Sequence, residues 1–166
     1  MKATWRLPDV RATEALGAAL ARHCPWDEHT ARLVFLSGEL GAGKTTLAAA
    51  LLQALGVGEV VRSPTYALIE TYAALAGEAV HIDLYRLQGA DDLAQLGVRD
   101  YLNPHTLLLV EWPERAAAAL PGADLTVRLQ CISADPAAGR SACLEALSAA
   151  GERWLTHTLA ALPQQI

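Results

Sequence analysis

A glycine-rich segment in the first third of the chain, Gly38–Thr45, constrains the fold more than any other feature. Its residues, G-E-L-G-A-G-K-T, fit the pattern G-x-x-x-x-G-K-[ST]. It follows the continuous apolar run Leu33–Leu36, which is typical of a strand buried on both faces in a parallel sheet. Leucines then recur at every fourth position up to Leu55, which predicts a helix from Lys44 with Gly56 as its C-cap. These residues predict a strand, a tight turn and a helix within an α/β fold.

The segment has the residue types that a phosphate-binding loop needs. Gly38, Gly41 and Gly43 permit backbone angles that other residues resist, so successive N–H groups can point at an anion near the positive end of the helix dipole. Lys44 would place its charge at the β- and γ-phosphates, and Thr45 would offer a hydroxyl to Mg²⁺. The residues expected to bind a nucleotide here are Glu39, Leu40, Gly41, Ala42, Gly43, Lys44, Thr45 and Thr46. The alternative is a tight turn without a ligand.

Two acidic residues end apolar strands of the predicted sheet. Glu111 follows Leu107–Val110, and Asp83 follows Val80–Ile82. Ligands of open parallel sheets bind at the carboxyl ends of the strands, so both carboxylates are expected beside the loop, to hold Mg²⁺ or to orient water. Glu111 could instead be a solvated charge, and Asp83 could form a salt bridge with Arg86.

Two further features could serve either this site or the fold alone. His81 lies between apolar residues of its strand and would be either a hydrogen-bond donor behind the site or a core histidine. Ser63, Pro64 and Thr65 form a stiff loop, because the proline restricts Ser63 to extended geometry. The two hydroxyls are consistent with a switch that senses γ-phosphate, and equally with a plain turn.

The other segments predict a single mixed domain over residues 1–166. Asp9 is expected to cap a helix that runs to Arg22, after a short strand at Trp5–Leu7. Further strands are predicted at Tyr66–Tyr72, Val80–Tyr85, Leu125–Ile132 and Ala142–Leu147, and further helices at Asp91–Leu96, Pro113–Leu120 and Glu152–Leu162. The last two strands alternate apolar and polar residues, so they are expected to be antiparallel. The predicted fold is a P-loop NTPase-like α/β sheet with a parallel core, antiparallel additions and helices on both faces.

Composition excludes several classes of protein. With 52% hydrophobic residues the chain is not intrinsically disordered, and no apolar run approaches the ~18 residues of a membrane-spanning helix. A net charge of −5 without a basic run argues against direct binding of nucleic acid. Three widely spaced cysteines without a CxxC pair argue against a zinc site or a disulfide framework. Arg6, Asp9 and Arg11 interrupt the apolar core that a signal peptide needs, so a cytoplasmic location without membrane contact is expected.

Five short motifs in register resemble the TsaE family, also called YjeE, of small bacterial ATPases. They are G-E-L-G-A-G-K-T-T from Gly38, S-P-T-Y from Ser63, H-I-D-L-Y-R from His81, L-G-V-R-D-Y from Leu96 and V-E-W-P from Val110. The resemblance covers roughly residues 7–121 and implies a Mg²⁺-dependent ATPase of tRNA threonylcarbamoyladenosine biosynthesis that is weak alone. Its partners would be TsaB and TsaD, of which TsaD transfers the threonylcarbamoyl group. The ATPase would reset that complex between turnovers and contact tRNA only indirectly, through the basic surface of its partners.

The resemblance also implies roles for individual residues. The catalytic residues would be Lys44, Asp83 and Glu111, and the metal-binding residues would be Thr45, Asp83 and Glu111. A switch would consist of Ser63, Pro64 and Thr65. Trp112, Asp9 and Thr13 would lie beside the nucleotide. The phosphate loop shows no departure from the pattern of the family.

Two other functions remain open from the sequence. A small-molecule kinase would share the loop, but it usually has an arginine-bearing lid, and no lid is evident between Arg86 and Arg99. A nucleotide-dependent binding module, in which bound ATP only stabilises a complex, would need neither Glu111 nor Asp83 for hydrolysis.

Overall fold

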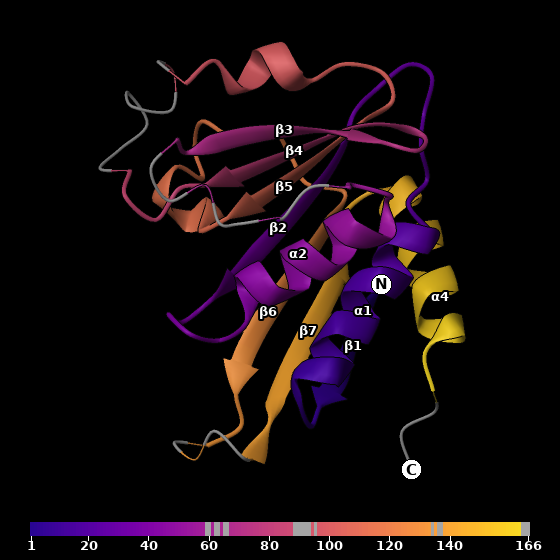
Figure 1. Ribbon diagram of the computed structural model, residues 1–166, viewed down its shortest axis with the longest axis vertical. Helices are drawn as coiled ribbons and strands as arrows, with labels where there is room; N and C mark the ends of the chain where they lie inside the picture. The colour runs from indigo at the N-terminus through magenta and orange to yellow at the C-terminus, as the bar shows by residue number, and fades with distance from the viewer. Residues whose placement is uncertain are drawn as a thin grey trace.

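The computed structural model describes residues 1–58, 61, 64, 67–87, 94, 96–133, 135 and 138–163. Its centre is a seven-stranded sheet with the order β1-β7-β6-β2-β5-β4-β3 (Figure 1). The strands are β1 (Lys2–Leu7), β2 (Arg32–Gly38), β3 (Ile69–Ala74), β4 (Gly77–Asp83), β5 (Thr106–Glu111), β6 (Leu125–Cys131) and β7 (Arg140–Ala146). The sheet is strongly twisted, so that β3 and β4 run across the view while β6 and β7 run nearly down it.

The sheet has the predicted parallel core with antiparallel additions. Strands β4, β5, β2 and β6 are parallel neighbours, whereas β3 pairs antiparallel with β4, and β7 pairs antiparallel with both β6 and β1. The prediction that Leu125–Ile132 and Ala142–Leu147 are antiparallel strands is confirmed for their pairing with each other, but it missed that β6 also runs parallel to β2 on its other side. Alternation of apolar and polar residues there reflects one open face of the sheet, which a strand with one parallel neighbour can also have.

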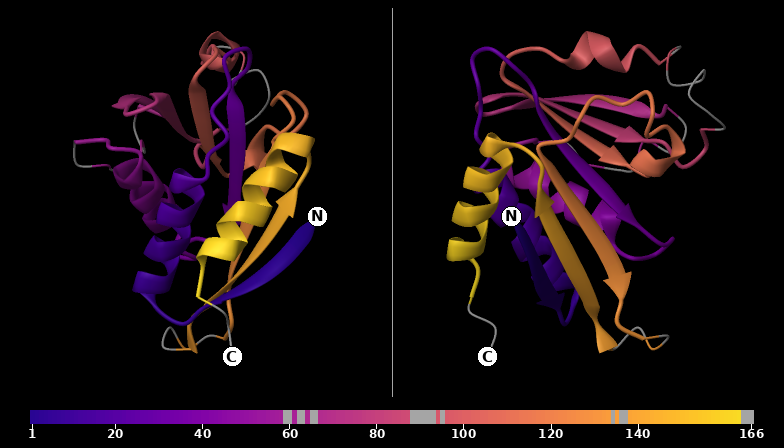
Figure 2. Two further views of the ribbon diagram at one scale, coloured as in Figure 1. Left: turned by 90° about the vertical axis from the view of Figure 1, so that its right-hand side faces the viewer. Right: turned by 180° about the vertical axis from the view of Figure 1, so that it is seen from behind.

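Three α-helices of the described residues cover one face of the sheet (Figure 2). They are α1 (Val10–Arg22), α2 (Lys44–Ala54) and α4 (Ala149–Ala161). Helix α1 packs closely on α2, because a Cβ at Gly17 would lie 2.6 Å from the carbonyl oxygen of Leu47. The indole N–H of the fully buried Trp154 donates to the carbonyl of Leu20 at 2.8 Å and ties α4 to α1. This face contains the larger hydrophobic core.

The opposite face is covered only in part. Two 3₁₀-helices, η1 (Val98–Tyr101) and η2 (Pro113–Arg115), pack with the segment up to Ala123 against β2, β5 and β4. Helical elements therefore lie on both faces, with the α-helices that the structure describes on one and 3₁₀-helices on the other. The predicted helix Pro113–Leu120 is regular only in η2, and the predicted helix Asp91–Leu96 falls largely outside the described residues.

The elements around the phosphate loop match the local predictions, except that the C-cap of α2 is Leu55 and not the predicted Gly56. The carboxylate of Asp9 caps α1 by accepting from the backbone N–H of Ala12 at 2.8 Å. Helix α2 begins at Lys44 and has Leu55 as its C-cap, so that Gly56 follows in the left-handed conformation, with φ +87°. No helix in the described part of the chain is long and apolar enough to cross a membrane.

Candidate functional site

The glycine-rich segment forms a tight loop between β2 and α2. Gly38, Gly41 and Gly43 have φ values of +136°, +79° and +103°, which other residues rarely adopt. A Cβ at Gly38 would also collide with the backbone carbonyl of Leu129 on β6, so this position tolerates no side chain. The loop therefore needs its glycines, and it ends directly at the N-terminus of an eleven-residue helix, the geometry that favours a bound anion.

Lys44 is buried at the base of this loop, with 4% of its surface exposed. Its Nζ donates to the carbonyl oxygens of Gly38 at 2.7 Å and Glu39 at 2.9 Å, and it lies 3.7 Å from the centre of the Trp112 ring. Burial lowers the pKa of Lys44, an effect that the nearby carboxylates, led by Glu111, oppose. The ammonium is thus held by the loop itself, in a place from which it can reach a bound phosphate.

The acids at the ends of β4 and β5 meet beside the loop. Asp83 and Glu111 are paired residues of the two parallel strands, and both are buried, with 7% and 1% exposed. The Oε2 of Glu111 accepts from the hydroxyl of Thr45 at 3.2 Å, and the Oδ1 of Asp83 accepts from the backbone N–H of Tyr85 at 3.0 Å. Hydroxyl and carboxylate oxygens are the ligands that Mg²⁺ prefers, together with phosphate oxygens and water, so Thr45, Glu111 and Asp83 fit this ion.

A cavity of about 350 Å³ opens where these groups converge. Its lining residues are Leu40, Gly41, Gly43, Lys44, Thr45, Thr46, Asp83, Tyr85, Glu111, Trp112 and Arg140. A larger cavity of about 760 Å³ lies on the other side of the loop and shares Trp112 with it, but it faces the open half of the sheet and contains neither Lys44 nor Glu111. The smaller cavity is the candidate site because it brings together the lysine, the hydroxyls and both acids.

Trp112 separates the two cavities and has an unusual backbone. It follows Glu111 directly and adopts a left-handed conformation, with φ 58° and ψ 47°, which costs free energy in a residue other than glycine. Its backbone N–H donates to the carbonyl of Leu36 at 3.1 Å, and its ring lies 5.0 Å from the ring of Tyr85. The ring thereby forms one wall of the cavity over Lys44.

Several of the predicted residues take places outside the cavity lining. Asp9 uses its carboxylate to cap α1, whereas Thr13 is buried and lies near Gly43 of the loop. Glu39 lines the larger cavity, and Ala42 is fully buried in the core beneath the loop.

The predicted switch is only partly visible. Ser63 and Thr65 lie outside the described residues. Pro64 is buried, accepts a hydrogen bond from the backbone N–H of Leu68 at 2.8 Å, and is not among the residues that line the cavity.

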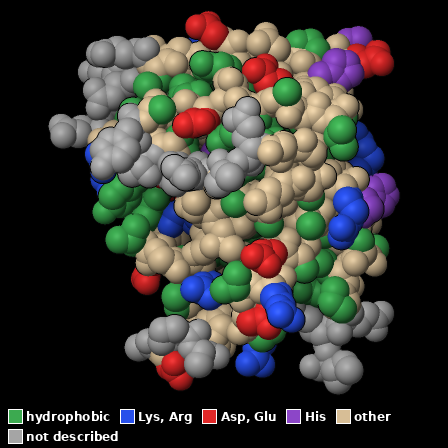
Figure 3. Space-filling model, in the orientation of Figure 1, with side chains coloured by type: hydrophobic (Ala, Val, Ile, Leu, Met, Phe, Trp, Pro, Cys, Tyr) green, Lys and Arg blue, Asp and Glu red, His purple; other side chains and the backbone are tan. Residues whose placement is uncertain are grey.

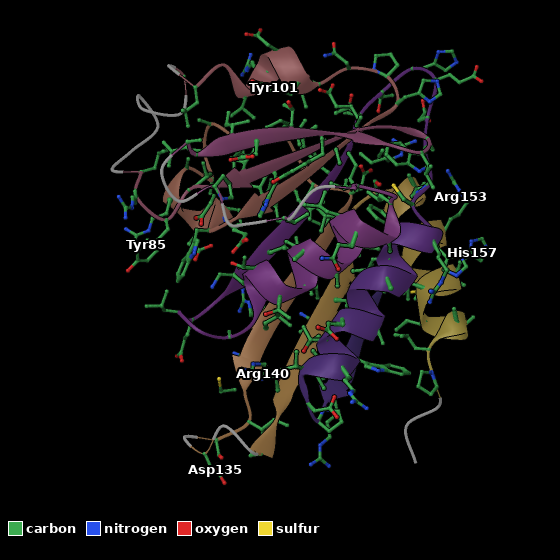
Figure 4. All side chains as sticks on the ribbon, in the orientation of Figure 1. Tyr85, Tyr101, Asp135, Arg140, Arg153 and His157 are labelled. Carbon is green, nitrogen blue, oxygen red and sulfur yellow. The ribbon has the colours of Figure 1, made fainter. Side chains whose placement is uncertain are left out.

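Two lining residues were missed by the sequence analysis. Tyr85 follows β4, and Arg140 begins β7; both are labelled in Figure 4 and reach the loop from different elements. The Nη2 of Arg140 donates to the carbonyl of Gly41 at 3.4 Å, while its Nε is buried without a partner among the described residues. No local pattern marks Arg140, since only the pairing of β7 with β6 brings it to the loop.

Comparison with known proteins places the chain in a family. The family model described as Threonylcarbamoyl adenosine biosynthesis protein TsaE matches residues 7–140. The chain belongs to the TsaE family. The match ends at Arg140, so it includes the phosphate loop, both acids, Trp112 and the two residues that the sequence analysis missed.

Curated relatives named "tRNA threonylcarbamoyladenosine biosynthesis protein TsaE" agree with this placement. The relative from Haemophilus influenzae is 46% identical over 98 residues, which are 58% of this chain and 61% of that protein. The relative from Streptomyces coelicolor is 37% identical over 134 residues, which are 78% of this chain and 88% of that protein. The crystal structure of YdiB from Bacillus subtilis has the same fold, with a TM-score of 0.78 and 23% identity over 96% of this chain and 95% of YdiB.

Proposed function

We propose that this chain is the Mg²⁺-dependent ATPase subunit of tRNA threonylcarbamoyladenosine modification and supports turnover of the TsaB–TsaD transferase. One observation carries the ATPase part of the proposal: the Thr45 hydroxyl and the buried Glu111 carboxylate are hydrogen-bonded at 3.2 Å beside a loop that holds Lys44. Membership of the TsaE family, and the printed names of its relatives, support the pathway. In this proposal the whole chain, residues 1–166, acts as one ATPase domain in the cytoplasm.

The residues of the loop would bind the phosphates of ATP. Backbone N–H groups at the start of α2 point toward the anion site, and Lys44 would exchange its bonds to the carbonyls of Gly38 and Glu39 for phosphate oxygens. Such an exchange replaces neutral acceptors by charged ones, which make stronger hydrogen bonds. Arg140, at the start of β7, donates to the carbonyl of Gly41 in the same loop and would add a second positive charge at the edge of the site.

The acids would complete the site. Thr45 and Glu111 would hold Mg²⁺, which when bound neutralises charge on the phosphate oxygens. Asp83, paired with Glu111 in the sheet, would hold a water of the metal shell or orient the attacking water. Because both carboxylates are buried, they act in a medium where electrostatic effects are larger than in water.

The charge of the chain supports an indirect relation to tRNA. The net charge is −5, and on the face in Figure 3 the basic and acidic side chains are interspersed, with no basic stripe. A protein that bound tRNA directly would need clustered Lys and Arg. TsaB and TsaD would therefore provide the surface that holds tRNA, and hydrolysis by this chain would depend on those partners.

The first test is ATP hydrolysis by the purified chain, alone and with TsaB, TsaD and tRNA. The Glu111→Ala variant should bind ADP but lose at least about 100-fold in hydrolysis, since it removes a group that organises the metal or the water. Glu28→Ala, which removes an exposed acid, is the matched control and should behave as wild type. Nucleotide binding without hydrolysis in every mixture would refute the ATPase and favour a binding module that uses ATP only to stabilise a complex.

A further inference from the structure

His81 is a fully buried polar residue that the proposed reaction does not yet use. It lies on β4 with 0% of its surface exposed, two residues before Asp83. Its Nε2 is 2.9 Å from Oε1 of Glu111, whose other oxygen accepts from the Thr45 hydroxyl at 3.2 Å. The carboxylate of Glu111 is therefore held at both oxygens, by the imidazole on one side and by the proposed metal-binding hydroxyl on the other.

The chemistry of the two groups determines which of them donates the hydrogen bond. A carboxylate has no proton to donate, so Nε2 of His81 must carry the hydrogen and donate to Glu111. The Nδ1 of His81 is buried and has no hydrogen-bond partner among the described residues. A proton on Nδ1 would therefore be an unsatisfied buried donor, and the arrangement favours the tautomer with hydrogen on Nε2 alone.

A purely structural role explains this residue poorly. His81 stands in a strand whose neighbours Val80 and Ile82 are fully buried and apolar. An apolar residue would fill the same space without an unsatisfied ring nitrogen. The one polar contact that the described residues offer to His81 is with Glu111, so the contact accounts for a histidine at this position.

We propose that His81 is the positioning residue of the metal site: through its Nε2–H it fixes the Glu111 carboxylate so that Oε2 faces Thr45. This inference rests on the proposed function, because it assumes that Thr45 and Glu111 hold Mg²⁺. Partners that orient a metal-binding carboxylate contribute to metal affinity, and removal of such a partner typically costs about 10- to 100-fold.

The test uses three substitutions of the full chain that differ in where they place a donor. His81→Gln places an amide N–H near the position of Nε2, His81→Asn places it near the position of Nδ1, and His81→Met places none. Each variant is titrated with Mg²⁺ in the presence of saturating ADP, by calorimetry, and ADP affinity is measured separately without metal. Val80→Ala is the matched control, because it removes a buried side chain of the same strand from the opposite face of the sheet.

The expected result separates metal affinity from folding and from nucleotide binding. Mg²⁺ affinity should fall about 10- to 100-fold in His81→Met and His81→Asn, with recovery in His81→Gln, while metal-free ADP affinity stays within about twofold in all three. Val80→Ala should lower thermal stability and leave Mg²⁺ affinity unchanged. Wild-type Mg²⁺ affinity in His81→Met, or an equal loss in all three His81 variants, would overturn the inference.

A second measurement needs no metal and no activity. Nitrogen-15 NMR of the imidazole in the metal-free chain reports which ring nitrogen carries the hydrogen, and the expected form has it on Nε2. Hydrogen on Nδ1 alone would overturn the inference even if the chain hydrolyses ATP. Failure of the wild-type chain to bind Mg²⁺ with ADP would instead overturn the proposed function, and the inference with it.

Discussion

The two halves of the sheet differ in how many of their faces are covered by other elements. Strands β2, β5 and β4 are covered on both faces, by α-helices on one side and by η1, η2 and their connections on the other. In the part of the chain that the structure describes, strands β6, β7 and β1 are covered only on the helical face, and their other face carries polar residues such as Arg128, Gln130 and Glu145. The loop, both acids and His81 belong to the covered half.

This difference explains why the site lies where it does. Buried acids and a buried lysine need a protein environment that excludes water and supplies partners, and in the covered half β4, β5 and the loop after β2 bring these partners together. Thr45, His81 and Glu111 form a hydrogen-bonded chain there. The open half contributes to the site only at its edge, through Arg140.

Among the expected differences between covered and open surfaces, the difference in cysteine reactivity should be the largest. Burial raises the pKa of the Cys24 thiol from 9.0 to about 12, which leaves about 1,000-fold less reactive thiolate near pH 8. Cys131 is exposed at the end of β6, and Cys143 lies partly exposed on the open face. Iodoacetamide should modify Cys131 and Cys143 before Cys24, as mass spectrometry can measure. Equal rates for all three cysteines in the native chain would contradict the exposure of the open face.

Core substitutions should show the next largest difference. Leu108 on β5 is fully buried in the second core, so Leu108→Ala should lower the free energy of unfolding by about 2–5 kcal/mol. Gln130→Ala removes an exposed side chain from β6 on the open face, and its effect should stay within about 0.5 kcal/mol. Urea unfolding of both variants measures the contrast, and a loss above 2 kcal/mol at Gln130 would show that the open face is packed.

The chain has two lysines, Lys44 in the covered half and Lys2 in the open half, and their substitution should affect nucleotide affinity differently. Lys44→Ala removes a charged donor to phosphate and should weaken ADP binding by about 2–3 kcal/mol, or roughly 100-fold. Because burial lowers the pKa of Lys44, the charge is disfavoured in the folded chain and the variant should be no less stable near pH 7. Lys2→Ala, on exposed β1, should leave ADP affinity unchanged, as calorimetry can measure.

The same variants test the wider function. Complementation of tRNA modification by Lys44→Ala should fail, whereas Lys2→Ala should succeed. Full modification activity from Lys44→Ala would refute the proposal that bound nucleotide drives turnover of the partners.

The covered half was predictable from the sequence because its signals are local. The run Leu33–Leu36, the glycine pattern of the loop and the acids that end Leu107–Val110 and Val80–Ile82 each act within a few residues. The parallel sheet then brings the ends of these strands together. Proximity of Thr45, Asp83 and Glu111 thus followed from local patterns and one topological rule.

The open half was harder to predict because its features depend on pairing. Alternation in Leu125–Ile132 predicted antiparallel pairing, which β6 has with β7, but β6 proved parallel to β2 on its other side. Arg140 reaches the loop only because it pairs with Cys131 at the end of β6. Left-handed backbone at Trp112 likewise has no sequence signal, since a tryptophan rarely adopts it.

The smallest expected effect is that of an exposed ion pair between β1 and β7 in the open half. Lys2 and Glu145 lie 3.4 Å apart with 63% and 45% of their side chains exposed. A double-mutant cycle with Lys2→Ala and Glu145→Ala should give a coupling of only about 0.2–1 kcal/mol, further reduced by salt, because water screens exposed charges. A coupling well above 1 kcal/mol that persists in 1 M salt would mean that this pair is shielded from water. The open half of the sheet would then not be exposed to solvent as described, since its open face would have a cover that β1 and β7 alone do not provide.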